Sequence, residues 1–271
     1  ICGLSHGENV WFGNARDLIR NKTCELMNVI GCRDDIMVTM LEYGLEPFDA
    51  FSIMENVRKA TKNLTTEQEK KMIDHHVPNW YIDSCKKIKY MFPKAHAVAY
   101  TMMSIRVAWY KYYKPLEYYA TYFTTRCDTY DIATLISGEK AVRQKYNEIQ
   151  EKRARKEKLT TKEEALDIVF EIALEMIERG YHFSPISLEY SQANKFILDP
   201  NDEKGLIPPF SAIDALGDAV ASTVVEARKN GPFLSKEDVV KRTKLNNSHI
   251  KTLSKMGVFD GMQERNQLSL F

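Results

Sequence analysis

Apolar residues recur with helical periodicity along the first two thirds of the chain. They return at intervals of three and four positions, which places them on one face of an α-helix. Prolines and capping residues mark the expected starts, and glycines such as Gly44 and Gly180 mark ends. The predicted helix starts are Asp34 or Asp35, Pro47, Thr65 or Thr66, Asn79, Pro93, Pro115, and Thr160 or Thr161. The adjacent Asp34 and Asp35 suit helix capping better than metal binding, because neighbouring helical side chains point about 100° apart.

The pattern changes after Gly180. Short alternating runs at 182–184 and 195–198, with turn residues at 199–202, predict a small sheet. Helices are expected to resume near Phe210, where an apolar helix, a tight turn containing Gly217 and a second helix from Asp218 form a helix-hairpin-helix pattern. The predicted fold is therefore mainly α, a multi-helix domain followed by a small α+β domain.

The start of the helix expected over 93–113 carries a first candidate site. Pro93 at the first helical position leaves free N–H groups and the positive end of the helix dipole beside Lys94. His96 and Tyr100 are four residues apart and share one face. Together these groups suit a triphosphate and a base, although a surface lysine with a packed histidine and tyrosine fits the same spacing.

The turn at Gly217 is a second candidate, for nucleic acid. Hairpin amides bind a backbone phosphate without reading sequence. Ala215 replaces one hairpin glycine, and Asp218 also fits a simple capping role, so a purely structural hairpin stays open. The cations that follow favour DNA, because they would neutralise phosphates. These are Lys229, Lys236, Lys241, Arg242, Lys244 and Lys251.

The C-terminal peptide is a third candidate. Its last five residues combine a glutamine with closely spaced apolar side chains: Gln267, Leu268, Ser269, Leu270 and Phe271. An extended peptide of this kind docks in a preformed apolar groove of a partner. The alternative is a tail that folds back over its own domain.

Composition narrows the class of protein. With 271 residues, 44% hydrophobic and 28% charged, the chain is globular, which excludes disordered, collagen-like and disulfide-scaffold classes. A net charge of only +1 means that DNA binding must rest on local patches. The five cysteines form no CxxC pair, which argues against a zinc ribbon and fits a reducing cytosol. The most apolar stretch, 96–110, contains Arg106 and is too short and charged to span a bilayer, so we expect a cytoplasmic chain without membrane contact. Because it starts at Ile1 without a leader, we also expect a piece of a longer protein.

Four motifs resemble one protein family. They are Gly-Leu-Ser-His-Gly at 3–7, Ile-Gly-Cys-Arg-Asp-Asp-Ile at 30–36, the run from Trp80 through Lys-Lys-Ile-Lys-Tyr-Met-Phe-Pro-Lys-Ala-His at 86–96, and the terminal Gln-Leu-Ser-Leu-Phe. All are similar to the C-terminal part of the PolC-type alpha subunit of bacterial DNA polymerase III, the replicative polymerase of low-GC Gram-positive bacteria. The resemblance covers essentially the whole chain.

The resemblance implies three segments and a reaction. Residues 1–178 would be the fingers, 179–258 the duplex-binding domain with its helix-hairpin-helix, and 259–271 a tail with a sliding-clamp motif. Family polymerases transfer a nucleotide from a dNTP to a primer 3′ end with Mg²⁺ held by palm aspartates. Those aspartates lie outside this chain, so it should hold no catalytic residue and no cofactor, and should be inactive alone.

The resemblance also implies site residues and partners. The expected nucleotide contacts are Lys94, His96 and Tyr100, with Arg33, Arg58 and Lys59 as further phosphate contacts. The expected DNA contacts are Leu216, Gly217, Asp218, Lys241, Arg242 and Lys244. The expected clamp contacts are residues 267–271. The partners would be primer–template DNA, dNTP, the sliding clamp and the rest of the polymerase, with its palm, thumb and exonuclease. Two alternatives remain. One is a non-catalytic helical module that binds DNA and a clamp. The other is a helix-hairpin-helix repair enzyme, which would need a catalytic Lys or Asp beside the hairpin, where Asp214 and Asp218 are the available residues.

Overall fold

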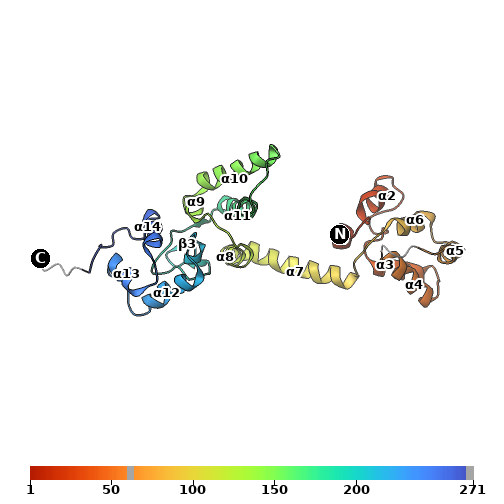
Figure 1. Cartoon of the computed structure of the whole chain (residues 1–271). Coiled ribbons are helices and arrows are strands. Elements are labelled where there is room, and N and C mark those ends of the chain that lie inside the picture. Colours follow the sequence, from red (N-terminus) through yellow and green to blue (C-terminus); the bar gives the residue numbers. More distant parts are fainter. Residues whose placement is uncertain (60–63, 267–271) are drawn as a thin grey trace. The chain divides into compact units, whose positions relative to one another are not determined.

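The computed structural model describes residues 1–59 and 64–266 (Figure 1). The chain packs as two compact units, residues 1–107 and 108–271, and the helix α7 contributes residues to both. Helices dominate both units, and one small sheet lies in the second, which confirms the predicted mainly α fold with a small α+β part. The functional boundary expected between residues 178 and 179 stays a prediction.

The first unit is a bundle of short helices. Pro47 and Asn79 begin helices as predicted, and Thr65 forms the capping box with Gln68. The helix expected from Asp34 or Asp35 instead begins at Arg33, after the N-cap Cys32. The elements are α1 (Cys2–His6), the irregular turn η1 (Trp11–Ala15), α2 (Arg16–Arg20), α3 (Arg33–Glu42), α4 (Pro47–Val57), α5 (Thr66–Asp74), α6 (Asn79–Lys87) and α7 (Lys94–Tyr113). Their core contains Ile30, Ile36, Met40, Ile53, Met72 and Met91, all buried.

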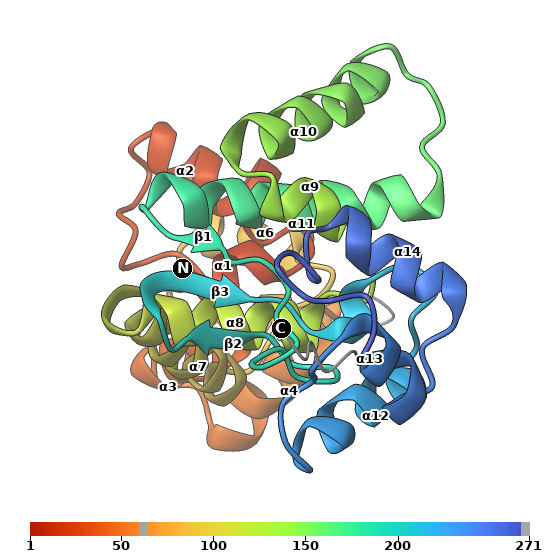
Figure 2. The same cartoon turned by 90° about the vertical axis from the view of Figure 1, so that its left-hand side faces the viewer.

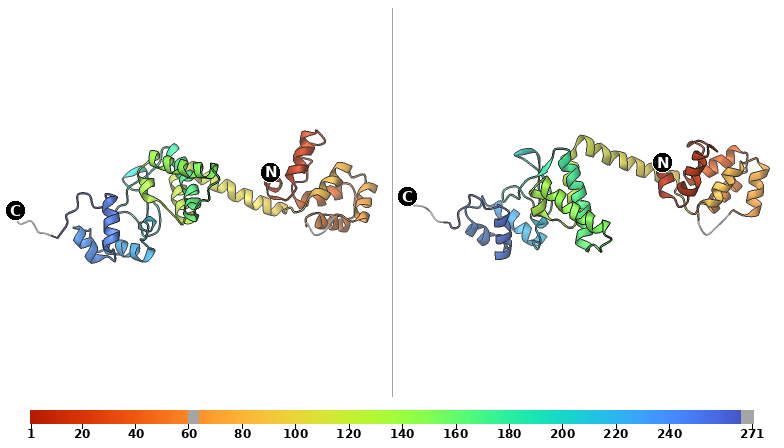
Figure 3. Two further views of the ribbon diagram at one scale, coloured as in Figure 1. Left: turned by 45° about the horizontal axis from the view of Figure 1, so that its top comes forward. Right: turned by 90° about the horizontal axis from the view of Figure 1, so that it is seen from above.

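The second unit opens with helices and ends with helices, with the sheet between them. Pro115 begins α8 and Thr160 caps α11 together with Glu163, both as predicted. Helices α10 and α11 lie side by side as a hairpin, drawn in green in Figure 3. The elements are α8 (Pro115–Arg126), α9 (Ile132–Ile136), α10 (Glu139–Ala154), α11 (Thr161–Glu178), β1 (His182–Phe183), β2 (Ile197–Asp199), β3 (Asp202–Ile207), the 3₁₀ turn η2 (Phe210–Ala212), α12 (Asp218–Arg228), α13 (Lys236–Arg242) and α14 (Asn247–Lys255).

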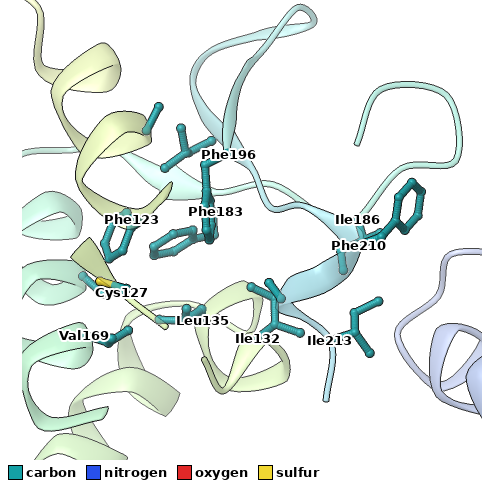
Figure 4. Packing of buried hydrophobic residues seen from close by; sticks show 14 of the residues in the cluster. Phe123, Cys127, Ile132, Leu135, Val169, Phe183, Ile186, Phe196, Phe210 and Ile213 are labelled. Carbon is teal, nitrogen blue, oxygen red and sulfur yellow. The ribbon is translucent and has the colours of Figure 1, made fainter. Parts of the chain in front are cut away.

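The predicted small sheet is confirmed and has the order β1-β3-β2 (Figure 2). Strand β3 pairs in parallel with β1 and antiparallel with β2 across the expected turn at 199–202. Aromatic rings join the sheet to α8: the ring centroid of Phe123 lies 5.2 Å from that of Phe183 and 5.5 Å from that of Phe196 (Figure 4). This aromatic contact anchors the sheet in the core of the second unit.

The prediction of an α-helix before the Gly217 turn is wrong. Between the prolines at 208–209 and the turn, only the single 3₁₀ turn η2 forms, and Ile213 is already extended. The chain has no room for an α-helix there, because Ala215 adopts a left-handed conformation only three residues after η2. The apolar side chains of this segment, including Ile213 and Leu216, are buried in the core instead. The second helix of the hairpin, α12, begins at Asp218 as predicted.

Across 1–59 and 64–266, no helix combines the length and apolar character that crossing a bilayer requires. Within the same ranges, no three side chains of His, Cys, Asp or Glu come together in a way that would hold a metal ion.

Candidate functional site

The start of α7 in the first unit is held by the start of α3. The carboxylate Oδ2 of Asp34 accepts a hydrogen bond of 2.6 Å from the backbone amide of Lys94, and the amide of Arg33 donates to the carbonyl of Phe92 over 3.1 Å. The sequence indicated free amides at this helix start, but Asp34 occupies one of them. Asp35, by contrast, caps its own helix, because its Oδ2 accepts from the amides of Gly31 and Cys32.

Three of the predicted phosphate contacts gather around Glu55 on α4. Its carboxylate binds the Arg58 guanidinium through two hydrogen bonds of 2.5 and 2.8 Å. The Lys59 ammonium lies 3.7 Å from the same carboxylate, and the Arg33 guanidinium lies 3.9 Å from it. The hydrogen bonds from Arg58 hold the pKa of Glu55 below its usual range, so this carboxyl is ionised. Three cations thus share one carboxylate, and the cluster keeps a local excess of positive charge.

A column of aromatic rings runs beside this cation cluster. The Tyr90 ring contacts Phe92 edge-on at 5.1 Å, Phe92 stacks on the His96 imidazole at 4.6 Å, and His96 meets the Tyr100 ring at 4.3 Å. The column begins at the cations, because Lys59 and Tyr90 are paired through their backbones. Tyr100 stays 58% exposed at the other end of the column. The structure therefore joins the predicted Arg and Lys residues to the predicted His96 and Tyr100.

Lys94 does not face this column. Two positions along a helix are about 200° apart, so the side chains of Lys94 and His96 lie on nearly opposite faces of α7. Lys94 instead lines a groove of about 840 Å³ in the first unit, together with Ala97 and Val98 one turn further along α7. At the junction of α3 and α7, Lys94 contributes its backbone amide, which donates to Asp34.

The Gly-Leu-Ser-His-Gly motif at 3–7 forms most of α1 and its C-cap, and its glycines allow close packing. A Cβ at Gly3 would lie 2.0 Å from the carbonyl oxygen of Gly31, and one at Gly7 would lie 2.4 Å from a methyl of Val10. The backbone of α1 therefore lies directly against the residues that precede α3. The close contact with Gly31 therefore explains why residue 3 is a glycine, which the sequence alone did not.

In the second unit, the turn before α12 presents three amides that have no partner among residues 1–59 and 64–266. Ala215 has a φ of 66°, in the left-handed region, and Leu216 is buried. Gly217 is the N-cap, and no side chain caps the helix. Within the described part of the chain, the amides of Gly217, Asp218 and Ala219 therefore donate to no protein acceptor. A helix start with free amides at a glycine suits a phosphate oxygen.

The predicted DNA-contacting cations divide into two kinds. Arg242 is committed to the fold: its guanidinium donates to Asp238 over 2.9 Å and to the carbonyls of Pro232 and Gly231 over 3.0 and 2.8 Å. Lys241 and Lys244 are exposed, and neither has a carboxylate within ion-pair distance in the described ranges. The backbone amide of Lys244 donates to Thr223 on α12, which places Lys244 beside the helix that carries the free amides.

The predicted clamp contacts at 267–271 lie outside the described residues. The residues just before them run along the start of α13, where the amides of Lys236 and Glu237 donate to the carbonyls of Gln263 and Glu264 over 2.9 and 3.1 Å. The described chain thus reaches Asn266 in a fixed position, with its side chain bound by the Ser235 hydroxyl.

Sequence reasoning missed four residues of the first unit. Asp34 was identified as a cap, but not for α7, because its partner lies 60 positions away. Glu55 was missed, although its spacing of three from Arg58 and four from Lys59 at the end of the predicted helix indicates such pairs. Tyr90 and Phe92 were quoted only as parts of a motif, and no spacing rule links them to His96 across the Pro93 junction.

Comparison with known proteins finds two family models that match parts of the chain. Residues 1–79 match the bacterial DNA polymerase III alpha subunit finger domain, and residues 180–268 match the helix-hairpin-helix motif. The whole chain is 52% identical to DNA polymerase III PolC-type of Listeria innocua and of Bacillus subtilis, and 49% identical to that of Staphylococcus aureus. Each match includes the whole of this chain but only 18% of the length of the relative.

Proposed function

Because this chain is homologous over its full length to one part of PolC-type DNA polymerase III, we propose that it is the nucleotide-positioning and duplex-holding part of a bacterial replicative DNA polymerase. In this proposal residues 1–178 are the fingers, 179–258 the duplex-binding domain and 259–271 the clamp-binding tail. The complete protein is a DNA-directed DNA polymerase of the cytoplasm, and this chain alone is inactive. Its partners are dNTP, primer–template DNA, the sliding clamp and the remaining polymerase domains.

The observation that carries the nucleotide role is the continuity of the cation cluster with the aromatic column. Arg33, Arg58 and Lys59 provide the charge that a triphosphate needs, while His96 and Tyr100 provide flat surfaces that suit a base. Glu55 holds the cations in place before the nucleotide arrives. Preorganised cations of this kind stabilise the charge that develops during phosphoryl transfer without reorganising in the reaction.

The metal ions of the reaction belong to another part of the polymerase. Bound Mg²⁺ would neutralise phosphate charge and activate the primer 3′ hydroxyl. We assign no metal ligand to residues 1–59 and 64–266. The part that we assign to this chain is to bind the triphosphate and orient the base relative to the primer end.

The duplex role depends on the turn before α12. Its three free amides would bind one backbone phosphate, and Lys241 and Lys244 would neutralise its neighbours. Contacts of this type ignore base sequence, as a replicative enzyme requires. We include Leu216 as the buried anchor of the turn and Asp218 as the first residue of the helix. Arg242 would contribute by holding the loop before α13 in place.

Single-nucleotide incorporation by the complete polymerase tests the nucleotide role. Arg58→Ala should raise the apparent KM for dNTP about tenfold or more, because a charge-assisted phosphate contact contributes roughly 1.5–3 kcal/mol. Lys70→Ala, which removes an exposed lysine of α5, is the matched control and should leave KM unchanged. An unchanged KM in Arg58→Ala, Lys59→Ala and His96→Ala would remove the triphosphate assignment.

Gly217→Asp tests the duplex role. Asp is a preferred N-cap residue, so its carboxylate should accept from the free amides and keep α12 as stable as before or slightly more stable. The same carboxylate would exclude a phosphate. We expect an equal or higher Tm together with at least tenfold weaker binding of the 271-residue chain to a labelled duplex. Unchanged affinity would show that the turn does not bind DNA.

A further inference from the structure

His249 connects helix α14 to the turn before α12. Its imidazole is buried, although its nearest partners are polar. Nε2 lies 3.1 Å from the carbonyl oxygen of Ala215, 34 positions earlier in the chain. Nδ1 lies 3.3 Å from the backbone nitrogen of Asn246, while the side chain of Asn246 accepts from the amide of His249 over 2.9 Å. Both ring nitrogens of His249 are thus in hydrogen-bonding positions.

These partners select one tautomer of His249. The backbone N–H of Asn246 can only donate, so Nδ1 must accept and carries no proton. The carbonyl of Ala215 can only accept, so Nε2 must carry the proton and donate. An imidazolium would set its Nδ1–H against the N–H of Asn246. The site therefore fits the neutral Nε2–H form.

The carbonyl that receives this proton belongs to a conformationally unusual residue. Ala215 has a φ of 66°, which residues with a Cβ rarely adopt, and the comparable position in such turns suits glycine. The hydrogen bond from His249 fixes the peptide plane between Ala215 and Leu216. That plane sets the direction in which the chain enters α12, two residues before the first of the three free amides.

We propose that His249 is a positioning residue for phosphate binding: it holds Ala215 in its left-handed conformation and so aims the amides of Gly217, Asp218 and Ala219 at one phosphate of a DNA duplex. This inference rests on the proposed role of the turn in duplex binding. It assigns to α14 a part in that binding, although His249 itself touches no DNA.

Two substitutions distinguish the effect of the hydrogen bond that His249 donates from the effect of its side-chain packing. His249→Leu removes both polar contacts, and it should weaken duplex binding about tenfold, measured by fluorescence anisotropy of a labelled duplex with the 271-residue chain. His249→Gln keeps a donor near the position of Nε2 and should stay within about threefold of the unchanged chain. Circular dichroism and Tm show whether each variant is folded.

A second substitution keeps the test decisive if His249→Leu loses stability. Glycine adopts a positive φ without strain, so adding Ala215→Gly to His249→Leu should restore most of the lost affinity. A loss of packing around residue 249 would not be repaired by a change at 215. No recovery in the folded double variant would overturn the inference, and so would full affinity in a folded His249→Leu chain.

Gly217→Asp, measured in the same assay, separates this inference from the function on which it rests. If Gly217→Asp weakens binding and folded His249→Leu does not, only the role of His249 is wrong. If neither substitution changes binding, the turn is not a phosphate site and the proposed duplex role fails with it. A two-bond ¹H–¹⁵N spectrum of the histidines should also report the Nε2–H tautomer for His249, and the opposite tautomer would contradict the inference.

Discussion

The carboxylate of Asp34 lies 2.6 Å from the backbone amide of Lys94, so that the first turn of α3 caps the first turn of α7. Asp34 is also 4.0 Å from the Arg33 guanidinium, which in turn reaches Glu55. One carboxylate therefore connects the start of the helix that carries His96 with the cation cluster. Negative charge at this point stabilises α7, and under the proposed function it would also oppose an incoming triphosphate.

Substitutions of Asp34 should separate these two effects. Asp34→Asn keeps an oxygen that can accept from Lys94 but removes the charge. It should hold Tm nearly constant and lower the apparent KM for dNTP in the complete polymerase. Asp34→Ala removes the acceptor and should destabilise the fold by about 1 kcal/mol, as lost helix caps do. An Asp34→Asn enzyme with a raised KM would show that the carboxylate assists nucleotide binding.

Gly3→Ala should be strongly destabilising. The added methyl would lie 2.0 Å from the carbonyl oxygen of Gly31, and backbone cannot yield as a flexible side chain does. We expect a loss of about 1–3 kcal/mol or more in chemical denaturation, as for other overpacked sites. Ser5→Ala, on the exposed part of the same helix, is the control and should change stability by much less. A loss in Gly3→Ala no larger than that in Ser5→Ala would mean that the contact with Gly31 does not limit the size of residue 3.

The sequence predicted local features well because each depends on residues near one another in the chain. Pro47, Thr65, Pro115 and Thr160 mark helix starts through backbone geometry and capping, which neighbouring residues determine. The cap of α7 by Asp34 depends on tertiary packing, which no local pattern records.

The candidate sites show the same division. His96 and the cations after the hairpin were recognised by residue type, and Arg33, Arg58 and Lys59 through the family resemblance. Whether a cation faces solvent depends on its partners in the fold. Arg242 and Lys244 look alike in sequence, and only the structure shows that the guanidinium is enclosed by carbonyls while the ammonium is exposed. The prediction of a helix near Phe210 was wrong because the apolar residues there pack into the core from a 3₁₀ turn and an extended segment, not from one face of an α-helix.

Lys244 and Arg242 should therefore respond differently to truncation. Lys244→Ala should leave Tm unchanged, weaken duplex binding at low salt, and lower the slope of log affinity against log salt by roughly one. Arg242→Ala should lower Tm markedly, because Asp238 and the carbonyls of Gly231 and Pro232 lose their donor. Lys140→Ala on α10 is the control for a lost surface charge. If Lys244→Ala leaves the salt slope intact, Lys244 does not contact phosphate.

Acid should weaken the start of α11 through Glu163. The hydrogen bond from Lys152, followed by those from Thr160, lowers the pKa of Glu163 to about 2 from an ordinary value of 4.5. A carboxyl whose pKa falls on folding contributes stability that is complete above the unfolded value and is lost as pH falls through the folded value. The contribution of Glu163 should thus be intact above pH 4.5 and disappear towards pH 2. Glu163→Gln keeps the capping box but cannot ionise. The Tm difference between the unchanged chain and Glu163→Gln should be constant near neutrality and shrink between pH 4.5 and about pH 2. A difference that stays constant down to pH 2 would show that the charge of Glu163 does not stabilise α11.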